Sequence, residues 1–163
     1  MTRATTRAVL GLAVALVVAG CSSGKPDFAG IGPYHVKKLT LAKATGRCEP
    51  TDLPDGRKGT WCFGQPALSI GGQRAEVDLY FGGTTPDAKV IEIQLQFRGC
   101  RDSELSTWLR TNFGTPADER TARAAWQNAN VFVLAELPSA PGRCIVRFLP
   151  RSEQAEFERL KQL

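Results

Sequence analysis

The stretch that decides the fold is Ala67–Phe97, with the sequence ALSIGGQRAEVDLYFGGTTPDAKVIEIQLQF. Apolar and polar residues alternate in both of its halves. The apolar positions are Val77, Leu79 and Phe81 in the first half, then Ile91, Ile93, Leu95 and Phe97 in the second. Such alternation predicts strands with one buried face and one wet face. Gly71-Gly72 predicts a tight hairpin turn, because glycine tolerates positive φ angles. Gly82–Ala88 predicts the next turn, so we expect an antiparallel meander.

The segment after this meander, Asp102–Phe113, predicts the main helix. Asp102 or Ser103 can cap its start, and Gly114 followed by Pro116 ends it. Its apolar positions recur at helical spacing and are Leu105, Trp108, Leu109 and Phe113. We expect this apolar stripe to pack on the buried face of the sheet.

Further strands are predicted on both sides of these elements. They are expected at Tyr34–Ala44, around Trp61–Phe63, at Thr121–Trp126, at Val131–Leu137 and at Cys144–Leu149. Val131–Ala135 is apolar on both faces, which is typical of a central strand. Gly46–Gly59 is rich in turn residues and predicts a loop. The predicted class is α+β: an antiparallel β-meander sheet packed by one main helix (about 102–113) and a short C-terminal helix that begins at Ser152.

The amino terminus, MTRATTRAVLGLAVALVVAGC, has the parts of a secretion signal. Arg3 and Arg7 form its positive region, and the apolar run Ala8–Gly20 is too short for the about 20 residues that cross a bilayer as a helix. Val18-Ala19-Gly20-Cys21 resembles the lipobox of bacterial lipoproteins. The resemblance implies cleavage before Cys21, a diacylglyceryl thioether on its sulfur, and often an acyl chain such as palmitate on the new amino terminus. A cysteine is needed because a thiolate is a good nucleophile.

These features divide the chain into a signal peptide (residues 1–20), a lipidated flexible tether (residues 21–33) and a single domain (residues 34–163). The tether is expected to be flexible because it is rich in Ser, Gly and Pro. Ser22 after the lipidated cysteine resembles lipoproteins released to the outer membrane of Gram-negative bacteria, which face the periplasm. In a Gram-positive host the same signal would place the protein on the outer face of the cytoplasmic membrane.

Four cysteines follow Cys21, and an even number in an exported chain predicts disulfides. They are Cys48, Cys62, Cys100 and Cys144. Four cysteines allow three pairings. We prefer Cys48–Cys62, which would clamp the turn-rich loop, and Cys100–Cys144, which would join the end of one strand to the start of another. The chain contains no Cys-x-x-Cys pair, so no metal site is expected.

The predicted main helix and the segment after it bear a second resemblance. The helix is followed by Phe113-Gly114-Thr115-Pro116, a strand with Trp126 and a second apolar strand. This order resembles a module of small envelope lipoproteins that accompany outer-membrane β-barrel assembly, and of β-lactamase inhibitor proteins. The resemblance covers about residues 102–137. It implies a helix packed on an antiparallel sheet.

Residues that could support catalysis are few. His35 is the only histidine, and no Gly-x-Ser-x-Gly motif accompanies it. Glu76, Asp78 and Glu92 could converge across the meander, and paired carboxylates can do acid–base chemistry. Each lies at a polar position of an alternating strand, however, where a charged side chain keeps the outer face wet. No cofactor is expected.

The sequence therefore predicts a membrane-anchored envelope lipoprotein that is a non-enzymatic binding or assembly component, with a protein partner in the envelope. Two alternatives stay open. One is an envelope hydrolase that uses Glu76, Asp78 or Glu92. The other is an inhibitor-like module that presents the loop of residues 49–59, held by Cys48 and Cys62. The net charge of +5, which falls by two when the signal is removed, is too mild to predict a nucleic-acid partner.

Overall fold

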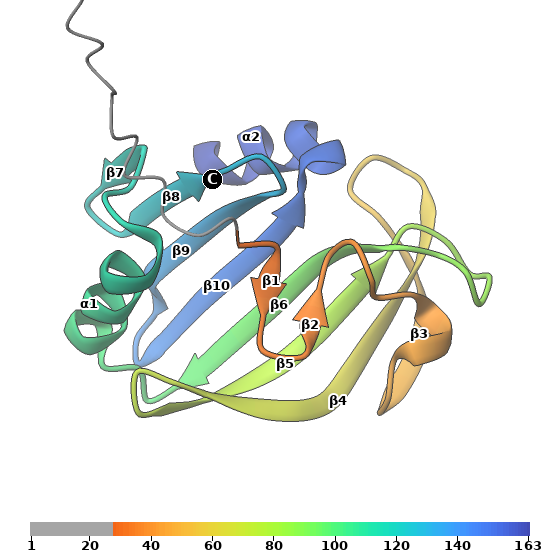
Figure 1. The fold of residues 1–163 in the computed structure, drawn as a ribbon, viewed down its shortest axis with the longest axis horizontal. Helices are drawn as coiled ribbons and strands as arrows, with labels where there is room; N and C mark the ends of the chain where they lie inside the picture. The colour runs from red at the N-terminus through yellow and green to blue at the C-terminus, as the bar shows by residue number, and fades with distance from the viewer. Residues whose placement is uncertain (1–27) are drawn as a thin grey trace, which may run out of the picture.

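The computed structural model describes residues 28–163, and one eight-stranded antiparallel sheet dominates them (Figure 1). The predicted signal peptide, Cys21 and the first part of the tether lie outside the described residues. The strands of the large sheet are β3 (Arg47–Asp52), β4 (Lys58–Ile70), β5 (Gln73–Phe81), β6 (Val90–Arg98), β7 (Asp118–Arg120), β8 (Arg123–Gln127), β9 (Val131–Ala140) and β10 (Arg143–Pro150). A separate two-stranded ladder pairs β1 (Gly30–Ile31) with β2 (Tyr34–His35).

The large sheet is built from two meanders. Its strand order is β3-β4-β5-β6-β10-β9-β8-β7, so strands β3 to β6 are neighbours in sequence and in space, and so are β7 to β10. The two meanders meet at a single antiparallel ladder between β6 and β10, which runs from Ile93 opposite Phe148 to Arg98 opposite Arg143. Helix α1 (Asp102–Phe113) follows the first meander, and helix α2 (Gln154–Gln162) follows the second.

One face of the sheet buries the main core. Leu105 and Leu109 of α1 are buried there against the inward side chains of both meanders. The amino-terminal segment of the described chain covers the same face, where the Phe28 ring lies 4.6 Å from the ring of Phe113 and Tyr34 is buried. Part of the predicted tether is thus ordered: Phe28, Ala29 and Ile31 pack on the core, and Gly30–Ile31 forms β1.

Helix α2 covers part of the opposite face. Its Phe157 ring stacks on Phe132 of β9, with ring centroids 4.2 Å apart. This second cluster of buried residues comprises Ala125, Phe132, Leu134, Leu149, Phe157 and Leu160. All residues of Val131–Ala135 are buried, as their two-sided apolar pattern predicted. The two helices thus lie on opposite faces of the sheet. The main helix and the short C-terminal helix are both present, but each packs on a face of its own.

Two predicted segments differ from the structure. Gly46–Gly59 is not a loop throughout: its first part forms β3, which pairs with β4 in an antiparallel hairpin. Pro50 is tolerated in β3 because this strand is at the sheet edge, where a missing N–H costs no ladder bond. Tyr34–Ala44 is a strand only at β2 and continues as a turn and a short 3₁₀ helix at Leu41–Lys43. No helix among residues 28–163 is long and apolar enough to span a bilayer.

Both disulfides join the cysteines that the sequence analysis preferred. Cys48 lies directly opposite Cys62 in the β3–β4 hairpin and is bonded to it. Cys100 follows β6 and is bonded to Cys144 at the start of β10, so this bond closes one end of the ladder between the two meanders. The sequence separations are 14 and 44 residues.

The two disulfides are expected to stabilise the fold unequally. On the chain-entropy model, replacing Cys100 and Cys144 by alanine removes about 4 kcal/mol, and replacing Cys48 and Cys62 removes about 3 kcal/mol, because the first bond closes the longer loop. Urea unfolding of the two double variants under oxidising conditions measures this order. A larger loss from the β3–β4 pair would contradict it.

Candidate ligand-binding pocket

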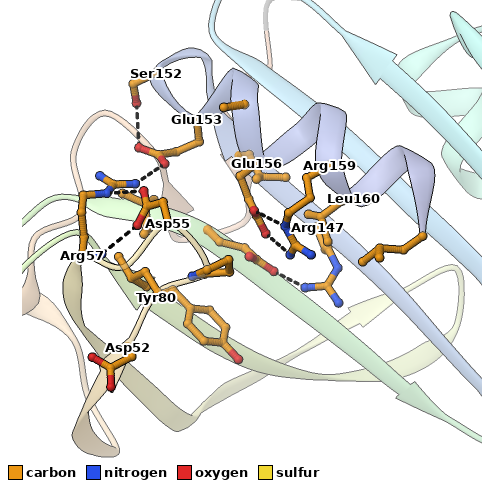
Figure 2. A pocket seen from close by; sticks show the side chains of 17 residues that line it. Asp52, Asp55, Arg57, Tyr80, Arg147, Ser152, Glu153, Glu156, Arg159 and Leu160 are labelled. Atoms are coloured by element: carbon orange, nitrogen blue, oxygen red, sulfur yellow. Dashed lines mark hydrogen bonds and ion pairs between the residues drawn. The ribbon is translucent and has the colours of Figure 1, made fainter.

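A pocket of about 700 Å³ lies on the polar face of the sheet, beside helix α2 (Figure 2). Three parts of the chain enclose it. The floor is formed by Tyr80 of β5, Glu92 of β6 and Arg147 of β10. One wall is the β3–β4 turn, residues 52–57, and the other is the 3₁₀ turn Arg151–Glu153 together with α2. The pocket is therefore assembled from segments far apart in the sequence.

The β3–β4 turn is folded inward over the sheet. Leu53 is buried, with 7% of its surface exposed, and its backbone N–H donates to the carbonyl of Arg57. Gly59 allows this close approach, because a Cβ there would lie 2.6 Å from the Phe81 carbonyl oxygen and 2.9 Å from Leu53 Cγ. The loop proposed to present an inhibitory segment, residues 49–59, is thus an edge hairpin whose tip lines the pocket.

A β-bulge in β6 brings Ile91 to the pocket. Tyr80 is opposite Glu92 and Phe81 is opposite Val90, so Ile91 has no partner in β5. The extra residue shifts the alternation, which places Val90 in the core and Ile91 among the lining residues. The prediction that Ile91 shares the buried face of Ile93 was therefore wrong. The repeat of two assumes a regular strand, and a bulge breaks it.

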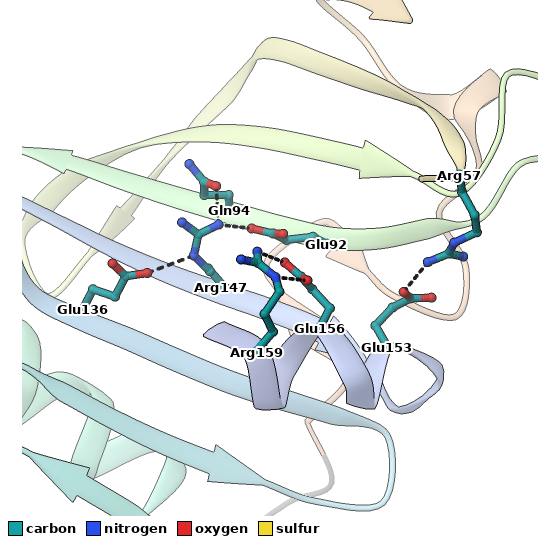
Figure 3. Close-up of polar contacts among 8 residues, drawn as sticks. All are labelled: Arg57, Glu92, Gln94, Glu136, Arg147, Glu153, Glu156 and Arg159. Atoms are coloured by element: carbon teal, nitrogen blue, oxygen red, sulfur yellow. Dashed lines mark hydrogen bonds and ion pairs between the residues drawn. The ribbon is translucent and has the colours of Figure 1, made fainter. Parts of the chain in front are cut away.

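The floor is held together by one arginine. Arg147 Nη1 donates to Glu92 Oε1 at 2.5 Å and to Gln94 Oε1 at 2.7 Å, and its Nε donates to Glu136 Oε1 at 3.1 Å (Figure 3). Glu92 and Gln94 are 9% and 7% exposed. The alternation predicted that this polar face is fully exposed to water. The structure differs, because Arg147, Glu92 and Gln94 bind one another and shield one another from solvent.

Burial raises the pKa values of two side chains on the floor of the pocket, Glu92 and Tyr80. Loss of water raises the pKa of Glu92 above its usual range, although Arg147 opposes the shift. Burial also raises the pKa of Tyr80 to about 12, and the nearby charges of Glu92 and Asp78 add to it. Tyr80 is therefore a neutral phenol at physiological pH, and burial makes the charge of Glu92 costly to keep.

Two further arginines line the walls. Arg159 of α2 donates two hydrogen bonds to Glu156, at 2.6 and 2.7 Å. Arg57 of the β3–β4 turn donates to Glu153 at 2.7 Å and to Asp55 at 2.5 Å. The pair of Arg57 and Glu153 ties the turn to the start of α2 and holds the two walls of the pocket together (Figure 3).

The structure brings only one of the three candidate carboxylates to the pocket. Glu92 lines it, whereas Glu76 lies outside it, is half-buried and is paired with Arg98 at 3.0 Å. Asp78 is buried outside the pocket and accepts a hydrogen bond from Gln96 at 2.8 Å. His35 lies in β2, which pairs with β1 outside the large sheet, and it does not line the pocket. Among the described residues no group of three His, Cys, Asp or Glu side chains is arranged to hold a metal ion.

Most residues of the pocket were not predicted from the sequence. Arg147 is the central residue, and a signal for it was present: it is the charged residue inside the apolar strand Cys144–Leu149. Glu136 interrupts the other apolar strand in the same way. An isolated charge in a strand buried on both sides has to find a partner of opposite sign, because an unpaired buried charge is costly. The helix residues Glu156 and Arg159 had no comparable signal.

The raised pKa of Glu92 predicts a specific pH dependence of stability. A carboxyl whose folded pKa exceeds its unfolded value favours the folded state at low pH, and this contribution is lost as pH rises through the folded pKa. Glu92→Gln should therefore gain stability relative to wild type as pH rises above the ordinary pKa of a glutamate side chain, about 4, towards neutral pH. Urea unfolding across this range measures it, with Glu76→Gln, on the same face outside the pocket, as control. Parallel curves for wild type and Glu92→Gln would contradict the assignment.

The pocket has to be interpreted from its own geometry. No family model, no curated protein and no solved structure matches this chain. The resemblance of residues 102–137 to outer-membrane-assembly lipoproteins and β-lactamase inhibitor proteins accordingly stays a prediction. The charges, the burial and the shape described above are what any functional proposal must explain.

Proposed function

We propose that the mature protein is a lipid-anchored, non-enzymatic binding component of the bacterial cell envelope, and that the pocket is its binding site. The lipobox-like sequence Val18–Cys21 supports the anchor. The observation that supports binding is a hollow of about 700 Å³ with both apolar and polar lining. Volumes of this size are usual for sites that take small molecules or the side chains of a peptide.

The placement of the carboxylates favours binding over hydrolysis. The hydrolase alternative requires two of Glu76, Asp78 and Glu92 to face one substrate, as acid and base. Only Glu92 lines the pocket. It is held by Arg147, and the other glutamates of the pocket are held by Arg57 and Arg159. Groups fixed in this way provide a rigid, preorganised surface for a ligand.

The surface favours a pocket ligand over a broad docking face. Among residues 28–163, Leu163 is the one large hydrophobic side chain that is exposed, at 70%, and it lines the pocket. Protein docking sites usually present a contiguous apolar patch of several hundred Å². The inhibitor-like alternative needs a protruding loop, whereas the tip of the β3–β4 hairpin is tied to Glu153 through Arg57.

The described chain begins at the end of the sheet where the pocket lies. Asn128, in the β8–β9 turn, donates a hydrogen bond to the Phe28 carbonyl. The antiparallel registers place this turn at the same end as the end of β10 and the β3–β4 turn. A lipid on Cys21 would therefore hold the pocket close to the membrane. We propose the periplasmic side of the outer membrane, or the outer face of the cytoplasmic membrane in a Gram-positive host.

The anchor predicts acylation at one residue. In cells that produce the full chain and are fed an alkyne-bearing fatty acid, the wild type should carry the label and remain with membranes, because two or more acyl chains give durable attachment. Cys21→Ala should lose both properties, and Ser22→Ala should keep both. Equal labelling of Cys21→Ala and wild type would contradict the anchor.

If the pocket is a binding site, the protein should retain a ligand, and a substitution on α2 that fills the pocket should prevent this. Wild-type protein purified from its own membranes should retain a ligand in native mass spectrometry. Ala155→Trp should lose it, because Ala155 lines the pocket and the larger side chain fills the cavity. Gln154→Trp is the matched control, since Gln154 is exposed on the same helix and does not line the pocket. No ligand on the wild type, or equal ligand on both variants, would contradict the proposal.

A further inference from the structure

The pocket has more negative than positive charge. Its lining contains five carboxylates, Asp52, Asp55, Glu92, Glu153 and Glu156, and three arginines, Arg57, Arg147 and Arg159. Two of the arginines are shared: Arg147 serves both Glu92 and Glu136, and Arg57 serves both Asp55 and Glu153. Arg159 and Glu156 balance each other, and Asp52 is paired with Lys58 outside the pocket. The shared arginines leave uncompensated negative charge on the floor and on the wall.

One carboxylate oxygen on the floor is available to a ligand. Arg147 donates to Oε1 of Glu92, and no group of the described chain donates to Oε2. Glu92 is 9% exposed and lines the pocket, and its Oε2 still reaches solvent. A ligand that displaces this solvent has to bring a hydrogen-bond donor to Oε2, because a carboxylate oxygen closed off without a donor is costly.

The other lining residues of the pocket are suited to a ligand that combines a cationic group with an apolar part. The Tyr80 ring lines the pocket (Figure 2), and Tyr80 is opposite Glu92 in the β5–β6 ladder. Aromatic faces attract ammonium groups. The apolar lining includes Leu53, Pro54, Ile91, Leu149 and Leu160. An anionic ligand has less to gain, because each of the three arginines already donates to a carboxylate.

We propose that the pocket binds an organic cation, an ammonium or guanidinium group attached to an apolar body. This inference rests on the proposed function and adds the chemical class of the ligand. The cation lies over the Tyr80 ring and donates to Glu92 Oε2, and the apolar body lies along α2 and the β3–β4 turn. Arg147 stays bonded to Glu136 and Gln94 and keeps the Glu92 carboxylate in place.

The test compares three probes with the same body and different charge: phenylbutylammonium, phenylbutanol and phenylbutyrate. They are titrated calorimetrically into the mature acylated protein in non-ionic detergent micelles, with empty micelles as the blank. The wild type should bind the ammonium at least about tenfold more tightly than the carboxylate, as expected for one hydrogen bond between charged groups. A preference for the carboxylate, or no difference among the three, would overturn the inference.

Two variants test whether Glu92 is the residue that causes the preference for the ammonium probe. Glu92→Gln should weaken binding of the ammonium by about tenfold and leave phenylbutanol unchanged, because the amide keeps a hydrogen-bond acceptor but loses the charge. Glu76→Gln, on the same face outside the pocket, should change neither. Equal loss of ammonium binding in both variants would assign the preference to the general charge of the protein and overturn the inference.

The outcomes separate the ligand class from the proposed function. Binding of all three probes with equal affinity, abolished by Ala155→Trp, would leave a binding pocket and remove the preference for a cation. Wild-type protein that binds none of the probes but retains another molecule in native mass spectrometry would likewise keep the function and overturn the ligand class. Loss of the acyl anchor alone would leave the preference for a cation intact.

Discussion

The ladder between β6 and β10 is the constraint on which the rest of the structure depends. It is the only backbone pairing between the two meanders in the described sheet. The side chains on one of its faces, such as Ile93 and Phe148, form the middle of the main core. On the other face Arg147 is directly opposite Gln94 and reaches Glu92, so the polar network of the pocket crosses the same seam. The packing of the core and the arrangement of the pocket therefore both depend on the register of the β6–β10 ladder.

The pocket exists because α2 covers only part of its face. The helix packs on β9 and β10 through Phe157 and Leu160, and the polar side chains of β5 and β6 lie beyond its edge. These polar groups are partly shielded from water, so they have to satisfy one another. Ion pairs between buried groups add little net stability, because desolvation offsets their attraction. Their value here is positional: Arg147 fixes the carboxylate that a ligand would meet.

The repeating patterns of the sequence predicted the local structure well, and the long-range parts poorly. The alternation in Ala67–Phe97 indicated the meander, and the two-sided apolar run Val131–Ala135 indicated the central strand. The edge strand β3 was hidden, because Pro50 and its turn-forming neighbours are tolerated where one side of a strand faces solvent. Ile91 was misplaced because a bulge has no signature in a repeat of two. The preferred cysteine pairs were chosen because one would clamp the turn-rich loop and the other would join the end of one strand to the start of another.

The site was beyond sequence reasoning for a geometric reason. Its parts come from the β3–β4 turn, from β5 and β6, and from the last strand and helix, and only the tertiary fold brings them together. The sheet's two edges have a consequence of their own. One edge is β3, which contains Pro50 and is locked in register by a disulfide, and the other is β7, only three residues long. Neither offers a long free row of backbone donors and acceptors to another chain. Copies of the protein at high concentration are thus protected from aggregation through edge-to-edge strand pairing.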